Sequence, residues 1–324
     1  MKFIKFILAG ATLMCNIALA NGPIELIVPF PPGGAAGNLS HVMAEILTEN
    51  GLPTIVVNKP GADATIGANL AAEAAPNGKT LFMGSGSTLT ANVAFGVTGM
   101  KYNEKSFVPI MPLGEVGQVL IVPPNSPIKN YEQFKFYVKA NPDKFFVGFW
   151  NTNYSKILYA WAEAEGLPRP TIIIYKGSAA LELDVMGGQI LAGVDPWTTP
   201  SQLFAGGKLG VLAGFTNDVI SQIKDIDPKN PSVSIAKNHP ELAFSVWYGL
   251  YAPAGTPTEI TTKINTILNA ALKQPKWEEK MAKFYLKNYG GNPDKLIEWQ
   301  RRDLKTLRRI KAQEDAENKT GVDK

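Results

Sequence analysis

Residues 24–38 read IELIVPFPPGGAAGN, and this stretch predicts a buried strand, a glycine-rich loop and the start of a helix. The apolar run from Ile24 to Phe30 ends at two prolines and two glycines. Beyond the loop, apolar residues recur at helical spacing from Leu39 to Leu47, so we expect a helix from about Asn38. The same order of strand, loop and helix recurs along the chain. It indicates βαβ units on a parallel sheet.

Two series of such units are predicted. The first has strands and helices at Thr54–Val57, Ile66–Ala75 and Thr80–Gly84, with a further helix opening at Ser85-Gly86-Ser87-Thr88. The second has them at Lys144–Trp150, Ser155–Glu165, Thr171–Tyr175, Ala179–Met186, Ile190–Val194 and Lys208–Phe215. Near the end we expect a helix over Pro257–Leu272 with Thr256 as its N-cap, and helices near 275–286 and 293–316.

Apolar runs that follow one another without a helix separate the two series. They lie at Val108–Val122 and Phe244–Tyr251, and we interpret them as crossovers between lobes. The predicted fold class is therefore α/β with two hinged lobes, each a mostly parallel sheet flanked by helices. We assign residues 21–120 and 250–324 to the first lobe and residues 121–249 to the second. The hinge crossovers fall near 109–123 and 244–252.

The first twenty residues have the pattern of a signal peptide. Lys2 and Lys5 precede the short apolar run Phe6–Met14, and Ala18-Leu19-Ala20 supplies the small residues of a cleavage site. We expect the mature chain to begin near Asn21 in the periplasm; an uncleaved membrane anchor is the alternative. Cleavage would lower the formal charge from +4 to +2. No later segment reaches the about 20 apolar residues that a membrane span needs.

Cleavage would also remove Cys15, the single cysteine. A mature chain without cysteine suits an oxidising compartment, because no thiol can mispair. Lipidation of Cys15 is an alternative, although Met14 is larger than the small residue usual before a lipidated cysteine.

Ligands of open parallel sheets bind beyond the carboxyl ends of the strands, where helix N-termini also point. Three junctions of this kind are rich in small, polar or aromatic residues. The candidate ligand-binding residues are Phe30, Pro32, Gly33, Gly34, Ala35 and Ala36 in the first junction, Ser85, Gly86, Ser87 and Thr88 in the second, and Trp150, Asn153, Tyr154 and Ser155 in the third, faced by Asp195 and Trp197. Free backbone N–H groups and hydroxyls there favour a small anion.

Each junction also has a simpler interpretation. The glycines can make a plain turn, Ser87 or Thr88 can cap a helix, and either tryptophan can pack in a core. The spacing of the glycines is that of neither a dinucleotide fingerprint nor a P-loop, so no phosphate-bearing cofactor is expected.

Catalytic motifs are scarce in this sequence. His41 and His239 are its two histidines, and neither has a partner at metal-ligand spacing. No nucleophile elbow or metal cluster is present, so we expect neither an enzyme nor a metal site. The C-terminal helix is rich in arginine and lysine, but export argues against nucleic acid, and we interpret the helix as a solvated basic face.

An ordered set of short motifs resembles the Bug-type receptors, the solute-binding components of tripartite tricarboxylate transporters. The motifs cover nearly all of the mature chain: VPFPPGG at 28–34, NKPGA at 58–62, IGA at 66–68, APNGKTL at 75–81, YKG at 175–177, GGQ at 187–189, AGGKL at 205–209, WYGL at 247–250 and APAGTP at 252–257. The resemblance implies a Venus-flytrap fold and periplasmic capture of carboxylates for a membrane permease. It further implies that the loops at Phe30–Ala36 and Ser85–Thr88 hold one ligand carboxylate and that Asp195 helps to set specificity.

The chain departs from the family pattern at three places. Gly37-Asn38 stands where members carry an Asp, Leu158 stands where the Gly-Ser-x-x-His stretch ends in histidine, and Trp197 stands where smaller residues are common. These changes favour an aromatic or apolar-bodied carboxylate as the ligand. Separately, we expect the protein to be a monomer. Two other functions stay open: a sensor that presents its closed form to a membrane signalling partner, and a periplasmic enzyme on the same scaffold.

Overall fold

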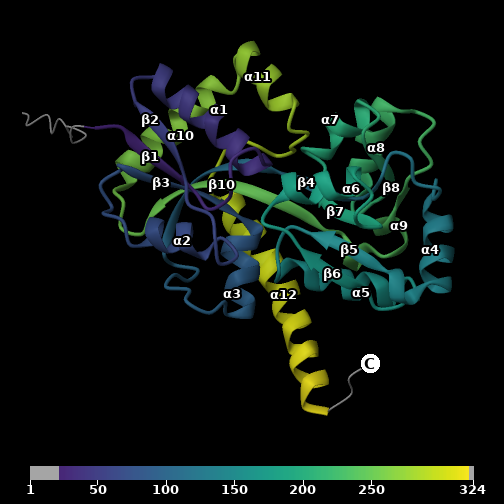
Figure 1. Cartoon of the computed structure of the whole chain (residues 1–324). Coiled ribbons are helices and arrows are strands. Elements are labelled where there is room, and N and C mark those ends of the chain that lie inside the picture. Colours follow the sequence, from purple (N-terminus) through teal and green to yellow (C-terminus); the bar gives the residue numbers. More distant parts are fainter. Residues whose placement is uncertain (1–21, 321–324) are drawn as a thin grey trace, which may run out of the picture.

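The computed structural model describes residues 22–320, and its side chains are described through residue 316. The predicted signal peptide, residues 1–20, and Cys15 lie outside the described residues. Strands and helices form two groups that lie side by side, and only the C-terminal end of helix α12 (Asp294–Thr320) projects beyond them (Figure 1). Within the described residues, no helix is long and apolar enough to cross a membrane.

The first lobe contains a sheet in the order β2-β1-β3-β10-β4. Strands β1, β2 and β3 are parallel, whereas β10 runs antiparallel to β3 and β4. Helices α1, α10 and α11 lie on one face, and α2, α3 and α12 on the other (Figure 1). The elements are β1 (Ile24–Val28), α1 (Ala35–Glu49), β2 (Thr54–Asn58), α2 (Thr65–Ala72), β3 (Thr80–Ser85), the π-helical turn η1 (Ser87–Ala91), α3 (Asn92–Phe95), β4 (Phe107–Val122), β10 (Ser245–Pro253), α10 (Thr258–Ala271) and α11 (Pro275–Ala282).

The second lobe continues the sheet from β4. On one side of β4 lie β7, β5 and β6, and on the other lie β8 and β9. Its elements are α4 (Tyr131–Ala140), η2 (Pro142–Lys144), β5 (Phe146–Phe149), η3 (Tyr154–Lys156), α5 (Ile157–Ala164), β6 (Thr171–Ile174), α6 (Ser178–Met186), β7 (Ala192–Pro196), α7 (Pro200–Ala205), β8 (Gly210–Gly214), α8 (Asn217–Ile226), β9 (Val233–Ser234), α9 (Ile235–Asn238) and η4 (Pro240–Leu242). The predicted α/β class with mostly parallel sheets is observed.

Strand β4 belongs to both lobes. Residues Phe107 to Gly117 pair with β10, and from Gln118 onward the strand pairs with β7 and β8. Register shifts interrupt the β4–β10 ladder at two places, where the strand carries prolines and Gly114 at φ +112°. The apolar stretch expected at Val108–Val122 therefore forms a single strand of 16 residues. Long β4 and the returning β10 are the strands that connect the lobes.

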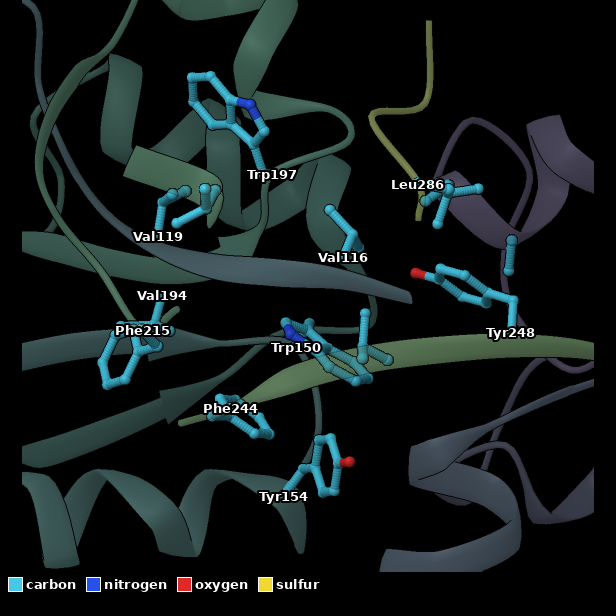
Figure 2. Packing of buried hydrophobic residues seen from close by; sticks show 14 of the residues in the cluster. Val116, Val119, Trp150, Tyr154, Val194, Trp197, Phe215, Phe244, Tyr248 and Leu286 are labelled. Atoms are coloured by element: carbon cyan, nitrogen blue, oxygen red, sulfur yellow. The ribbon is translucent and has the colours of Figure 1, made fainter. Parts of the chain in front are cut away.

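The strands of both lobes are apolar because their side chains are buried in a shared hydrophobic core. Leu26, Met83 and Leu250 of the first lobe and Leu120 and Val194 of the second are fully buried and belong to one hydrophobic cluster. Aromatic rings extend this cluster in the second lobe, where Phe244 lies near Tyr154 and Phe215 (Figure 2) and also near Phe149. Continuous packing across β4 and β10 holds the strand ends of both lobes close together.

Some expected boundaries were wrong. Helix α1 begins at Ala35 rather than near Asn38, because extended Gly34 (φ −83°, ψ 173°) already serves as its N-cap. Thr256 does not cap α10; its hydroxyl donates to the Pro253 carbonyl, and Pro257 is the N-cap. Helices α4 and α8 were not predicted. In α4, buried Tyr131, Phe134 and Val138 follow helical spacing, which periodicity could have identified.

Candidate functional site

A cavity of about 510 Å³, counting its solvent-open mouth, lies between the two lobes. Each lobe contributes strand ends and the loops that follow them. The lining residues are Phe30, Pro31, Pro32, Gly34, Ala35, Ala36 and Ser85 from the first lobe, Trp150, Lys176, Gly177, Ser178, Ala179 and Pro196 from the second, and Val246 and Tyr248 from β10, which connects the two.

The N-terminus of α1 forms one wall of the cavity. Gly33 has φ +92°, a conformation that favours glycine, and Gly34 caps the helix without any side-chain hydrogen bond. The Asn58 side chain donates to the Phe30 carbonyl at 2.9 Å and fixes the loop. The first N–H groups of a helix have no intrahelical partner, and together with the helix dipole they favour an anion. No acidic residue lies in the first turn.

The N-terminus of α6 forms the opposite wall. Its N-cap, Gly177, has φ +117° and ψ 169°, and as a glycine it likewise has no side chain that could cap the helix. A Cβ added to Gly177 would lie 3.8 Å from Cδ of Pro31 in the first lobe, so the two loops meet across the cavity. Lys176 beside it adds a cationic side chain to the lining. Two helix N-termini, one from each lobe, therefore face one cavity.

A cluster of hydroxyls closes the bottom of the cavity at the end of β3. Ser85 lines the cavity, and its Oγ lies 2.9 Å from Oγ of Ser87 and 3.3 Å from Oγ1 of Thr88. The Ser85 N–H donates to Thr88 Oγ1 at 3.0 Å. Ser87 and Thr88 thus stand behind Ser85 and orient it. This arrangement presents one oriented hydroxyl to a ligand, supported by two others.

Aromatic and apolar side chains make up much of the remaining surface. The indole of Trp150 stacks near Phe149, and its Nε1 donates to Oε1 of Gln118 at 3.3 Å. Phe30, Val246 and Tyr248 lie around the same space. Burial, together with the charge of Asp195, raises the pKa of Tyr248, so its phenol stays neutral. A ligand with an apolar body would fit such walls.

Asp195 lies at the end of β7, directly behind the cavity wall. It is fully buried, and its Oδ1 accepts a hydrogen bond from Ser178 Oγ at 2.7 Å. Burial, and then the charge of Glu182, raises the pKa of Asp195 well above its ordinary range. Asp195 therefore holds the side chain of Ser178, a residue of the cavity lining, in place.

The remaining candidate residues lie outside the cavity lining. Gly33 faces a second hollow, and Gly86 lies against Tyr154 Oη and Trp247. Ser155 bonds the Thr152 carbonyl, and Asn153 donates to Asn92 in the first lobe.

Trp197 is also placed differently from the expectation that it faces the cleft. Its fully buried ring packs near Phe204 and Tyr285, away from Trp150 and Tyr248 (Figure 2). The turn after β7 directs this side chain into the core.

The sequence analysis missed the β6–α6 junction and part of β10. Lys176, Gly177, Ser178 and Ala179 follow a strand and open a helix, which is the same signal that identified the other junctions. Val246 and Tyr248 carry no comparable local signal, since both lie within a strand and not in a junction between a strand and a helix. Within residues 22–320, no three acidic, histidine or cysteine side chains gather as a metal site would require.

Comparisons with known proteins agree with this geometry. Residues 37–314 match the family described as TctC, tripartite tricarboxylate transporter family receptor. The chain is similar to protein BugT of Bordetella pertussis, with 28% identity over 78% of this chain and 76% of that protein. It resembles the structure of periplasmic binding protein BugD at 25% identity, with a TM-score of 0.78 over 93% of this chain and 98% of that one.

The fold also resembles that of R. palustris Rpa4515, whose structure contains adipate. Identity is 23% and the TM-score is 0.78, over 89% of this chain and 95% of that one. This likeness concerns the fold. Together these comparisons support the two-lobed binding-protein architecture.

Proposed function

The chain belongs to the tripartite tricarboxylate transporter receptor family, and from that premise we propose that it captures a small organic carboxylate in the inter-lobe cavity and delivers it to the membrane permease of such a transporter. One observation carries the proposal. The N-termini of α1 and α6, whose glycine N-caps provide no side-chain hydrogen bond, and Ser85 line the same cavity. N–H groups of this kind are suited to a carboxylate.

The energetics are sufficient for capture at low concentration. Micromolar affinity corresponds to about −8 kcal/mol. Each charge-assisted hydrogen bond contributes about 1.5–3 kcal/mol, and apolar contact adds to this before the costs of association are subtracted. Three such bonds from α1, α6 and Ser85, with contact on Phe30 and Trp150, reach the required range.

Binding by lobe closure follows from the strand connections. We assign the first lobe to residues 21–120 and 250–324 and the second to residues 121–249, with β4 and β10 as the hinge. A carboxylate would dock on the α1 loop, and the α6 loop would then close over it. A Cβ added to Gly177 would lie 3.8 Å from Cδ of Pro31, so the two loops lie close enough for the α6 loop to close over a ligand on the α1 loop.

The walls favour an aromatic or apolar-bodied carboxylate. Trp197, which the sequence placed in the cleft, does not form part of these walls, since its ring lies in the core. Phe30, Trp150, Val246 and Tyr248 provide the support instead. One structural relative holds adipate, a dicarboxylate with an apolar chain. A ligand of this shape would suit a cavity that has the N–H groups of a helix N-terminus at each end.

Cellular context completes the proposal. The family is one of transporter receptors, so we expect a periplasmic protein that is exported by its signal peptide and returns its ligand unchanged. We also expect the protein to be a monomer. A ligand recovered chemically altered after incubation would point to an enzyme instead.

A thermal-shift screen of the mature protein tests the proposal. The panel contains aliphatic and aromatic mono-, di- and tricarboxylates, because a ligand that binds only the native state raises the melting point by mass action. We expect a rise with at least one aromatic or apolar-bodied acid. Tight binding of citrate with no response to benzoate or adipate would contradict the assignment of ligand class, and no response to any acid would contradict carboxylate capture.

A further inference from the structure

Two buried carboxyl groups stand behind the α6 wall of the cavity. Asp195 is fully buried; Ser178, which lines the cavity, donates to its Oδ1, while Oδ2 has no hydrogen-bond partner among the described residues. Glu182 lies one helical turn beyond Ser178 on the same face of α6. It is 7% exposed, and its Oε1 is likewise unpartnered within the described part of the chain.

The other groups around this pair are mainly hydroxyls. The Thr198 and Thr199 hydroxyls, on the turn after β7, also have no partner within residues 22–320. Both threonines line a second hollow together with Glu182, on the side of the pair away from the ligand cavity. No lysine, arginine or histidine forms an ion pair with Asp195 or Glu182 among the described side chains.

Charged and titratable groups do approach from each packed element. On the cavity side these are Tyr248 of β10 and Lys176 of the β6–α6 loop. On the other side they are His41 of α1, Lys280 of α11 and Lys283, the C-cap of α11. Lys280 is engaged with Glu45 at 2.6 Å and Lys283 with Glu279 at 3.6 Å. The acidic pair therefore lacks a direct counter-charge.

Two desolvated carboxyl groups that share a site cannot both ionise cheaply. Burial raises the pKa of both, and the charge of Glu182 raises that of Asp195 further. A ligand carboxylate at the N-terminus of α6 would bring another negative charge close to Ser178 and hence to Asp195. The lowest-cost response is to neutralise one carboxylate with a proton.

We propose that the Asp195–Glu182 pair takes up a proton when a carboxylate binds in the inter-lobe cavity. The proton comes from water or buffer and forms an O–H bond on a carboxylate oxygen of the pair; no other bond forms or breaks. The inference rests on the proposed function for its ligand. It makes the receptor a proton-linked binder in which Glu182, outside the cavity, sets the linkage.

The sign of the pH effect follows from this arrangement. Bound anion raises the proton affinity of the pair, so ligand affinity is greatest at low pH and weakens as pH rises through the titration of the bound form. Because one proton is linked, affinity changes by at most about tenfold per pH unit. In Glu182→Gln, Asp195 loses its like-charged neighbour. The pH range over which ligand affinity falls therefore moves to lower pH.

The first arm of the test needs no ligand. Carbon-13 NMR of side-chain carboxyls follows the free protein between about pH 5 and about pH 8, the range in which ordinary carboxylates are already ionised. We expect a carboxyl resonance that titrates in this range in the wild type and shifts to lower pH in Glu182→Gln. The exposed Glu163→Gln variant is the matched control and keeps the wild-type titration. Absence of any such titration in the wild type overturns the proposal.

The second arm is calorimetric titration with adipate and with benzoate in two buffers of different ionisation heat. We expect net proton uptake on binding near neutral pH, reduced in Glu182→Gln and retained in Glu163→Gln. Binding with no proton uptake overturns the proton linkage but leaves the proposed function standing. An affinity that depends on sodium concentration and not on proton uptake has the same consequence. Failure of every acid to bind overturns the proposed function. The first arm, which needs no ligand, still tests the titration of the Asp195–Glu182 pair in that case.

Discussion

The Tyr154 hydroxyl donates to Oδ2 of Asp303 at 3.0 Å and so joins a loop of the second lobe to α12. The same carboxylate accepts from Trp247 Nε1 at 2.8 Å, and Arg302 Nε donates to its other oxygen at 2.9 Å. Nearby, Lys156 pairs with Glu314 of α12 at 2.6 Å. Tyr154 and Lys156, just before α5, therefore contact the C-terminal helix, and Tyr154 does not line the cavity, although the sequence predicted a ligand contact there.

Tyr154→Phe is expected to lower the free energy of unfolding by about 1–3 kcal/mol, because the buried Asp303 carboxylate loses a hydrogen-bond donor. Burial already raises the pKa of Asp303, so the remaining donors only partly offset the cost of its charge. Urea unfolding monitored by circular dichroism measures the effect. Tyr137→Phe on α4 is the control, and equal midpoints for the two variants would contradict a structural role for this bond.

Ser85→Ala is expected to weaken carboxylate binding about tenfold or more, since a charge-assisted hydrogen bond contributes about 1.5–3 kcal/mol. Ser87→Ala should weaken it less, because Ser87 reaches the cavity only through Ser85 at 2.9 Å. Both variants should remain folded. Calorimetry with the acid identified by the screen gives the ranking, and a larger loss for Ser87→Ala would show that Ser87 is the direct contact.

Gly177→Ala is expected to destabilise the protein by about 1–3 kcal/mol, because φ +117° with ψ 169° is open essentially to glycine alone. Affinity should fall as well, since the residue caps the α6 wall. Gly34→Ala is the matched substitution on the facing wall. Gly34 has φ −83°, and a Cβ there meets nothing within 4 Å, so its unfolding midpoint should move little. Equal destabilisation of both variants would argue against backbone strain at Gly177.

The two tryptophans of the predicted site should behave differently. Trp150→Phe is expected to raise the dissociation constant, because the ring lines the cavity and its Nε1–Gln118 bond is lost. Trp197→Phe is expected to act mainly on stability, by about 1–3 kcal/mol, since its ring is fully buried near Phe204. Melting curves and titrations on the same samples separate the effects; a binding loss confined to Trp197→Phe would reverse the assignment.

Local patterns were sufficient for much of the fold. The run from Ile24 to Val28 and the helix after Gly34 follow from apolar periodicity and the glycine loop, and the crossovers at β4 and β10 follow from apolar runs without a helix. Small residues after β1 and β3 indicated two walls of the cavity. These features depend on neighbours in the sequence, which is why the sequence shows them.

The direction of individual side chains could not be obtained in the same way. Trp150 and Trp197 both follow strands, yet one lines the cavity and the other enters the core, because the turn after each strand sets the direction. Tyr154 bonds Asp303, 149 positions away, and nothing in either segment indicates the partner. Glu182 resembles any polar helix residue until its burial beside Asp195 is known.

The central claim is that the cavity between the N-termini of α1 and α6 binds a carboxylate as an anion. Calorimetric titration of the mature protein with benzoate, adipate and citrate, each against its own amide, tests this claim most directly. We predict that at least one acid binds and that its amide, which has the same body without the charge, binds at least about tenfold more weakly. An amide that binds as tightly as its acid, or three acids that all fail to bind, would contradict the claim.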